Sequence, residues 1–240
     1  MSSALTIRNL NTSRSVPNAI PHDFMMQPPF RLIVCGASHS GKSNMVKNLI
    51  TLDEYGYKQH FGENVFVFSK TLGLDDTWKS LKLPKTHYYD RWNPDTVREI
   101  MTYSKKQKNG TLFLLDDLIS DSDAFNKKNS NLLSELFFQG RHWGVSLAIL
   151  TQKYHAVQSA LLANASQIIV FKLRTKREQD SFEESMTMFD DLNEKYQYAT
   201  REPYSFLYMN LATAKIYKNF TEELESGPQP AGSSDARVGP

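Results

Sequence analysis

Cysteine and long apolar runs are scarce in this sequence, and neither sign of charge dominates it. The one cysteine, Cys35, excludes an intrachain disulfide framework and suits a reducing compartment. No stretch of about 18 apolar residues occurs, so the sequence predicts no transmembrane helix, and its first residues lack the apolar core of a signal peptide. The formal net charge is only +2, so any nucleic-acid-binding surface must be local.

Composition divides the chain into three predicted parts. Hydrophobic residues make up 40% of the 240 residues, enough for the core of one α/β domain, which we place at residues 30–220. Residues 1–29 are polar and marked by prolines, and they predict an N-terminal arm. Residues 221–240 end in small, polar residues rich in proline and glycine, which predicts a disordered C-terminal tail.

A phosphate-binding loop is the strongest motif in the sequence. Residues 36–43 read GASHSGKS and fit the G-x-x-x-x-G-K-S pattern of P-loop NTPases in full. The motif follows the apolar run 32–35, which predicts a strand, and precedes residues 45–50, whose apolar positions recur at helical spacing. A strand, a glycine-rich loop and a helix in this order form the structural context that the motif requires.

Each fixed position of the loop has a physical reason. Gly36 and Gly41 allow a tight turn and a close approach of backbone N–H groups to phosphate oxygens, and the following helix directs its first N–H groups at the same anion. Lys42 can reach the β- and γ-phosphates of ATP, and the Ser43 hydroxyl can bind Mg²⁺. The predicted nucleotide-binding residues are Gly36, Ala37, Ser38, His39, Ser40, Gly41, Lys42, Ser43 and Asn44.

A second motif lies downstream. Residues 111–118 read TLFLLDDL, an apolar strand that ends in two acids, as in a Walker B motif. Ligands of open α/β sheets bind at the carboxyl edge of the strands, where these acids should lie. We expect Asp116 to hold Mg²⁺ through water, and Asp117 to orient or deprotonate the attacking water.

Hydrophobic patterns predict the remaining elements. Further strands are expected at residues 64–69, 86–89, 145–150 and 167–171, and helices are expected after Asn93, around residues 132–137 and after Thr175. Residues 195–218 alternate and are rich in aromatic side chains, which predicts a β-hairpin or meander that covers an edge of the sheet.

The spacing of these motifs favours the RecA-like division of P-loop NTPases over the kinase and GTPase division. RecA-like sheets have an additional strand between the phosphate-loop strand and the Walker B strand, with a polar sensor at its tip. Gln152 follows the strand predicted at 145–150 and fits that sensor. The predicted fold is therefore a mainly parallel sheet flanked by helices, of the additional-strand RecA-like type.

Residues 137–152, FFQGRHWGVSLAILTQ, resemble the G-R-x-x-G-h-x-h-h-h-x-T-Q block of the FtsK–HerA superfamily of DNA-pumping ATPases. The Gly-Arg-His form and the paired aspartates are most similar to the DNA packaging ATPases of poxviruses, other large DNA viruses and virophages. The resemblance covers roughly residues 30–218. It implies an ATP- and Mg²⁺-dependent motor that translocates double-stranded DNA into a preformed capsid.

The resemblance also implies roles for single residues. Lys42 and Asp117 would be catalytic, Gln152 the sensor, and Arg141 an arginine that completes the site of a neighbouring subunit in a ring of five or six. Many cellular relatives have Glu at the position of Asp117, so how directly Asp117 acts as a base stays open. Arg174 and Arg177 are alternatives to Arg141.

The implied partners are double-stranded DNA and a capsid vertex. DNA would be gripped through its phosphates, without sequence reading. Candidate contacts are Lys127 and Lys128 after the Walker B motif, and Lys153 and His155 after the sensor. The resemblance places the protein at viral assembly sites in the host cytoplasm or in the virion.

Other functions remain open from the sequence. Another FtsK–HerA-type DNA translocase, such as a segregation or conjugation motor, is the nearest alternative, although those proteins usually carry membrane segments or extra domains. A small-molecule P-loop kinase predicts an arginine-rich lid, which the sequence does not show, and the strand ending at Gln152 argues against it. A scaffold that does not hydrolyse ATP is disfavoured because Lys42 and the acid pair are present.

Overall fold

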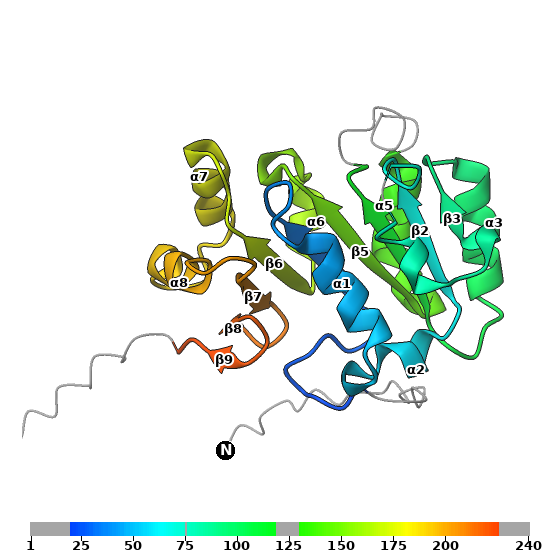
Figure 1. Ribbon diagram of the computed structural model, residues 1–240, viewed down its shortest axis with the longest axis horizontal. Coiled ribbons are helices and arrows are strands. Elements are labelled where there is room, and N and C mark those ends of the chain that lie inside the picture. The colour runs from blue at the N-terminus through cyan, green and yellow to red at the C-terminus, as the bar shows by residue number, and fades with distance from the viewer. Residues whose placement is uncertain (1–19, 75, 119–129, 226–240) are drawn as a thin grey trace, which may run out of the picture.

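The computed structural model describes residues 20–74, 76–118 and 130–225, and these residues form one mixed sheet with helices on both faces (Figure 1). The strand order is β3-β2-β4-β5-β1-β6-β7-β8-β9. The strands are β1 (Arg31–Cys35), β2 (Val65–Ser69), β3 (Tyr88–Tyr89), β4 (Thr111–Asp116), β5 (Val145–Thr151), β6 (Gln167–Phe171), β7 (Phe206–Asn210), β8 (Lys215–Lys218) and β9 (Glu222–Glu223).

Helices connect most of these strands. The α-helices in the described ranges are α1 (Lys42–Thr51), α2 (Tyr57–Phe61), α3 (Pro94–Ser104), α5 (Ser130–Gln139), α6 (Ser159–Asn164), α7 (Lys176–Ser185) and α8 (Leu192–Ala199). Short 3₁₀ helices are η1 (Asp53–Tyr55), η2 (Lys79–Leu81), η3 (Lys85–His87), η4 (Gly140–Trp143) and η5 (Tyr154–Ala156). Within the described ranges, none of the helices combines the length and apolarity that crossing a bilayer would need.

The order of the parallel strands confirms the predicted fold class. Strands β3, β2, β4, β5, β1 and β6 run parallel, and β5 pairs with the Walker B strand β4 on one side and the phosphate-loop strand β1 on the other. This is the additional strand of a RecA-like sheet. Strands β1, β4, β5 and β6 are buried on both faces, which explains why they read as continuous apolar runs rather than alternating ones.

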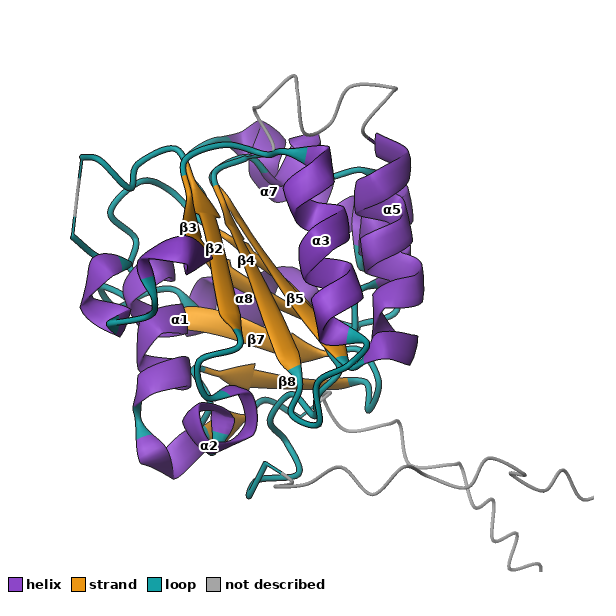
Figure 2. Ribbon diagram, turned by 90° about the vertical axis from the view of Figure 1, so that its right-hand side faces the viewer, coloured by secondary structure: helices purple, strands orange, loops and turns teal. Residues whose placement is uncertain are grey.

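Two hydrophobic layers enclose the sheet, as the edge-on view shows (Figure 2). Helices α1 and α2 pack on one face, where Val46, Leu49 and Phe61 are buried. Helices α3 and α5 pack on the other face, where Ile100 and Leu136 are buried. The sheet is held rigidly from both sides, so the loops at its carboxyl edge start from fixed positions.

The folded part extends beyond the predicted boundaries at residues 30 and 220. Ile20, Met25 and Met26 are buried, and the backbone carbonyl of Met26 accepts a hydrogen bond of 2.9 Å from the Tyr57 hydroxyl. At the other end, β9 pairs with β8 in antiparallel register. Polar composition masked the few apolar residues that anchor each of these segments.

The C-terminal region follows the prediction only in part. Strands β7, β8 and β9 form an antiparallel meander on the β6 edge, as expected. The start of the predicted strand region is instead part of helix α8, in which Leu192, Tyr196 and Ala199 are buried at helical spacing. Helices α2 and α6 were not predicted, because five or six residues are too few for a helical period to stand out.

Arg31 is buried at the start of β1, and within the described part of the chain its guanidinium bonds only to backbone carbonyls. Its guanidinium donates to the backbone carbonyls of Phe30 (2.8 Å), Val145 (2.7 Å), Leu136 (3.3 Å) and Phe137. Two of these carbonyls belong to the last turns of α5, where a helix leaves carbonyls without intrahelical partners. Arg31 therefore ties β1, β5 and the end of α5 together.

We predict that Arg31→Met lowers the free energy of unfolding by at least about 3 kcal/mol, because it leaves several buried carbonyls without a donor. Denaturant unfolding measures the change. The matched control is Arg98→Met on the surface of α3, where the arginine forms only an exposed ion pair with Asp95 and the expected change is below about 0.5 kcal/mol. Equal stability of the two variants would contradict the anchoring role.

Candidate active site

A cavity of about 320 Å³ lies at the carboxyl edge of β1, β4 and β5. Register explains its position: Cys35 of β1 aligns with Thr151 of β5, and Asp116 of β4 aligns with Leu150 of β5, so the three strands end side by side. The cavity brings together the phosphate loop, the acid pair and Gln152. Its lining residues are Ser38, His39, Ser40, Gly41, Lys42, Ser43, Asn44, Thr71, Thr77, Asp116, Asp117 and Gln152.

The two glycines of the phosphate loop are required by geometry. A Cβ at Gly36 would lie 2.6 Å from the Cβ of Phe171, too close for any other residue without a shift of β6. Gly41 has φ of 101°, a left-handed conformation that side chains rarely adopt, and it immediately precedes helix α1. The loop therefore closes tightly and places the start of α1 at the cavity, where a helix attracts anions.

The side chain of Lys42 folds back into the phosphate loop. Its side chain is 6% exposed, and its ammonium donates to the carbonyls of Gly36 and Ala37, each at 2.9 Å. Burial lowers the pKa of Lys42, while Asp117 and Asp116 act in the opposite direction. The loop thus holds a cation at the centre of the cavity, which suits a polyphosphate ligand.

Asp116 is the last residue of β4 and is nearly buried. Its Oδ2 accepts hydrogen bonds from the Trp78 indole at 2.7 Å and from the Ser69 hydroxyl at 3.4 Å. Burial raises the pKa of Asp116, and the Trp78 hydrogen bond opposes that shift. The sequence prediction missed Trp78 and Ser69. Ser69 could have been predicted, because it ends a predicted strand that lies beside the Walker B strand. Trp78 belongs to a segment without a recognisable motif.

Asp117 and Gln152 meet directly across the cavity. The backbone N–H of Asp117 donates to the Leu150 carbonyl at 3.0 Å, which fixes Asp117 to β5 directly after the end of β4. Its φ of 55° lies in the left-handed region. The Gln152 amide donates a short hydrogen bond to the Asp117 carboxylate. The sequence prediction gave these residues separate tasks, whereas the structure presents a carboxylate and an amide as one polar pair.

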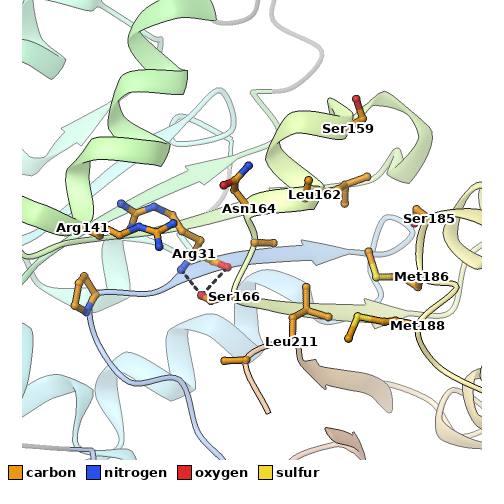
Figure 3. Close-up of a pocket in the computed structure, with 14 residues that line it drawn as sticks. Arg31, Arg141, Ser159, Leu162, Asn164, Ser166, Ser185, Met186, Met188 and Leu211 are labelled. Atoms are coloured by element: carbon orange, nitrogen blue, oxygen red, sulfur yellow. Dashed lines mark hydrogen bonds between the residues drawn. The ribbon is translucent and has the colours of Figure 1, made fainter. Parts of the chain in front are cut away.

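Arg141 lies at the opposite edge of the sheet. It is exposed on η4, which precedes the amino end of β5, and it does not line the phosphate-loop cavity. Because β5 is seven residues long, its two ends are about 20 Å apart. Arg141 instead lines a second cavity of about 670 Å³ next to Arg31, as Figure 3 shows. Burial, and then Arg141, lowers the pKa of Arg31 to about 10.

The other predicted cations fall into three groups. Arg174 donates to the Ser38 carbonyl at 3.3 Å, so it lies over the phosphate loop of its own chain, whereas Arg177 is exposed on α7. Lys153 is exposed next to Gln152, but the ring and the backbone N–H of His155 form hydrogen bonds with the buried Glu178 carboxylate, which fixes η5 to α7. Lys127 and Lys128 lie outside the described residues.

The strand order and this cavity define a RecA-like P-loop protein. Residues 83–197, 115 of the 240 residues, match the model of the Poxvirus A32 protein family. The matched segment includes Asp116, Asp117, Arg141 and Gln152, and it confirms the resemblance to viral packaging ATPases that residues 137–152 indicate.

One relative and several solved structures are similar to this chain. "Uncharacterized protein 015R" of frog virus 3 is 26% identical over 149 residues, which are 59% of this chain but only 44% of that protein. B204, the DNA-packaging ATPase from Sulfolobus turreted icosahedral virus, is 18% identical with a TM-score of 0.62, over 80% of this chain and 97% of that chain. The conjugation coupling protein TcpA of pCW3 is 11% identical with a TM-score of 0.52, over 81% of this chain and 62% of that chain. At these identities the structures confirm the fold.

We predict that Asp117→Asn reduces nucleotide hydrolysis by at least about 100-fold, because an amide cannot take a proton from water. Nucleotide binding should stay within about twofold, since the phosphate loop and Lys42 are unchanged. Steady-state hydrolysis and titration calorimetry measure the two effects. The control is Asp95→Asn, an exposed acid on α3 that does not line the cavity. Wild-type turnover of Asp117→Asn would remove Asp117 from the chemistry.

Proposed function

We propose that this protein is an ATP-driven motor that translocates double-stranded viral DNA into a preformed capsid. The observation that carries the proposal is the meeting of the phosphate loop, the acid pair and Gln152 in one cavity of a RecA-like sheet. The match to the Poxvirus A32 family and the similarity in fold to the packaging ATPase B204 support the choice of a packaging motor.

The residues of the cavity suit hydrolysis of a nucleoside triphosphate. Lys42 and the first N–H groups of α1 neutralise the phosphates. The Asp117–Gln152 pair is placed to orient a water molecule against the γ-phosphate and to accept its proton. Arg174, above the loop of its own chain, adds positive charge beside the phosphates.

The same cavity fits a magnesium ion. Oxygen donors from Ser43, Asp116, Thr71 and Thr77 line it, and Mg²⁺ in proteins prefers oxygen ligands together with phosphate groups. We assign the ion to Ser43 and Asp116. When bound, the ion would supply positive charge to the β- and γ-phosphate oxygens. The hydrogen bonds from Trp78 and Ser69 hold the Asp116 carboxylate in place for this task.

Geometry favours action of Arg141 on a neighbouring subunit. A side chain at the amino end of β5 does not span the length of the strand to reach its own phosphates. An arginine donated across a subunit interface stabilises charge on the transferring phosphoryl group and can raise the rate about 10³-fold or more. The motor would therefore be a ring of five or six subunits that act on one another.

DNA and a capsid vertex are the proposed partners. Exposed Lys153 follows the sensor Gln152, so it can couple the nucleotide site to a phosphate of DNA. Lys127 and Lys128 remain candidates on sequence grounds. The proposed location is the viral assembly site in the host cytoplasm, or the virion. A different DNA translocase of the same superfamily is the second candidate, supported by the similarity in fold to TcpA.

We predict that long double-stranded DNA stimulates steady-state ATP hydrolysis by the assembled protein. DNA that grips a ring aligns its subunits and so completes the sites between them. Coupled-enzyme assays with and without DNA measure the stimulation, and Lys42→Ala is the blank. Turnover that depends on Lys42 but is indifferent to DNA would contradict the motor and favour a phosphotransferase.

We predict that Arg141→Ala binds ATP normally but loses at least about 10³-fold in turnover. Mixing Arg141→Ala with Lys42→Ala subunits should restore activity, since a Lys42→Ala subunit can lend its arginine to an intact phosphate loop. Exposed Arg98→Ala on α3 is the control for loss of charge. Full activity of Arg141→Ala alone, or no recovery in assembled mixtures, would exclude action between subunits.

A further inference from the structure

Tyr204 stands out beside the phosphate loop because it is a large aromatic side chain that is 72% exposed. It precedes β7, in a turn at the carboxyl end of β6. Its φ of 64° lies in the left-handed region, which is unfavourable for a bulky residue. Backbone strain of this kind is often found where a side chain serves a ligand.

The Tyr204 ring adjoins the phosphate loop itself. A Cβ placed on Gly41 would lie 3.3 Å from the ring, so the tyrosine covers the loop where helix α1 begins. The ring also borders a cavity of about 390 Å³ on that side of the loop. Aromatic side chains dominate the lining of this cavity: Tyr55, Phe171, Tyr204, Phe206 and Phe220.

This aromatic cavity adjoins the phosphate-loop cavity. Gly41 and Asn44 line both, whereas Asp116, Asp117 and Gln152 line only the phosphate-loop cavity. A triphosphate whose γ-phosphate faces the acids can therefore leave the loop past Gly41. The ribose and base that follow the α-phosphate then arrive at the aromatic side.

Contacts within the chain hold the turn that carries Tyr204. The backbone N–H and hydroxyl of Ser205 both donate to the Glu202 carbonyl, at 3.2 and 2.7 Å. The Glu202 carboxylate forms ion pairs with Arg201 and Lys218. An exposed ring on a turn that is held in this way offers a stacking surface, and the backbone has little entropy to lose on binding.

We propose that this aromatic cavity binds the base of the nucleotide and that Tyr204 stacks on it. The inference rests on the proposed function and extends it to the recognition of the ligand. The ligand class is a nucleoside triphosphate, with the base held by an aromatic face. Asn44 and Asn48 lie on the side of α1 that lines the cavity, where their amides can meet the ribose.

The test compares ATP with inorganic triphosphate, which has no base. Tyr204→Asn removes the ring but keeps a residue that tolerates positive φ. It should weaken ATP binding about 5- to 140-fold while leaving inorganic triphosphate within about twofold, as measured by titration calorimetry with Mg²⁺. Tyr204→Phe should retain ATP affinity. The control is Tyr103→Asn, another partly exposed tyrosine, on α3.

The outcomes separate this inference from the proposed function. Unchanged ATP binding by Tyr204→Asn would overturn the stacking role, and so would equal weakening of ATP and triphosphate, which would indicate damage to the loop. If the wild-type protein binds inorganic triphosphate as tightly as ATP, the base adds no affinity, which would overturn the inference but leave the phosphate site intact. Wild-type protein that binds neither ligand would overturn both the inference and the ATPase proposal.

Discussion

Parallel pairing of β4, β5 and β1 is the constraint on which the rest of the structure depends. Because the three strands share direction and register, their carboxyl ends meet, and Asp116, Gln152 and the loop of Lys42 become neighbours although they are far apart in sequence. Burial on both faces fixes that register, since each strand is held by two hydrophobic layers. The chemistry of the site is thus a product of the sheet core.

The sequence predicted the elements with strong periods and the motifs with fixed spacing. The phosphate loop, the acid pair and the place of β5 were predicted from such patterns, and the strand order confirms the place of β5. The prediction failed where short segments or single contacts decide the structure. Residues 195–199 of helix α8 fell within the region predicted as a β-hairpin or meander, because their aromatic residues suit both structures. Trp78 gave no signal because only the tertiary fold brings it to Asp116.

Two environments of arginine illustrate what sequence patterns leave undetermined. Arg31 and Arg141 carry the same group, yet Arg31 is buried among backbone carbonyls while Arg141 is exposed beside it. The position of Arg31 before an apolar strand did not predict that its guanidinium is buried and bonds to backbone carbonyls. Its hydrogen bonds to the end of α5 hold the turn from which Arg141 projects, so the stability of the core and the placement of the proposed arginine finger are coupled.

Strand β5 also has a mechanical consequence. It is hydrogen-bonded to a neighbour on each side and buried along its whole length, so it resists bending, and its two ends move together. Gln152 follows one end and Arg141 precedes the other. If Arg141 serves the next subunit of a ring, as proposed, a displacement of Gln152 would be passed along the strand to the neighbouring site. The order in which the subunits hydrolyse ATP would then depend on the stiffness of this one strand.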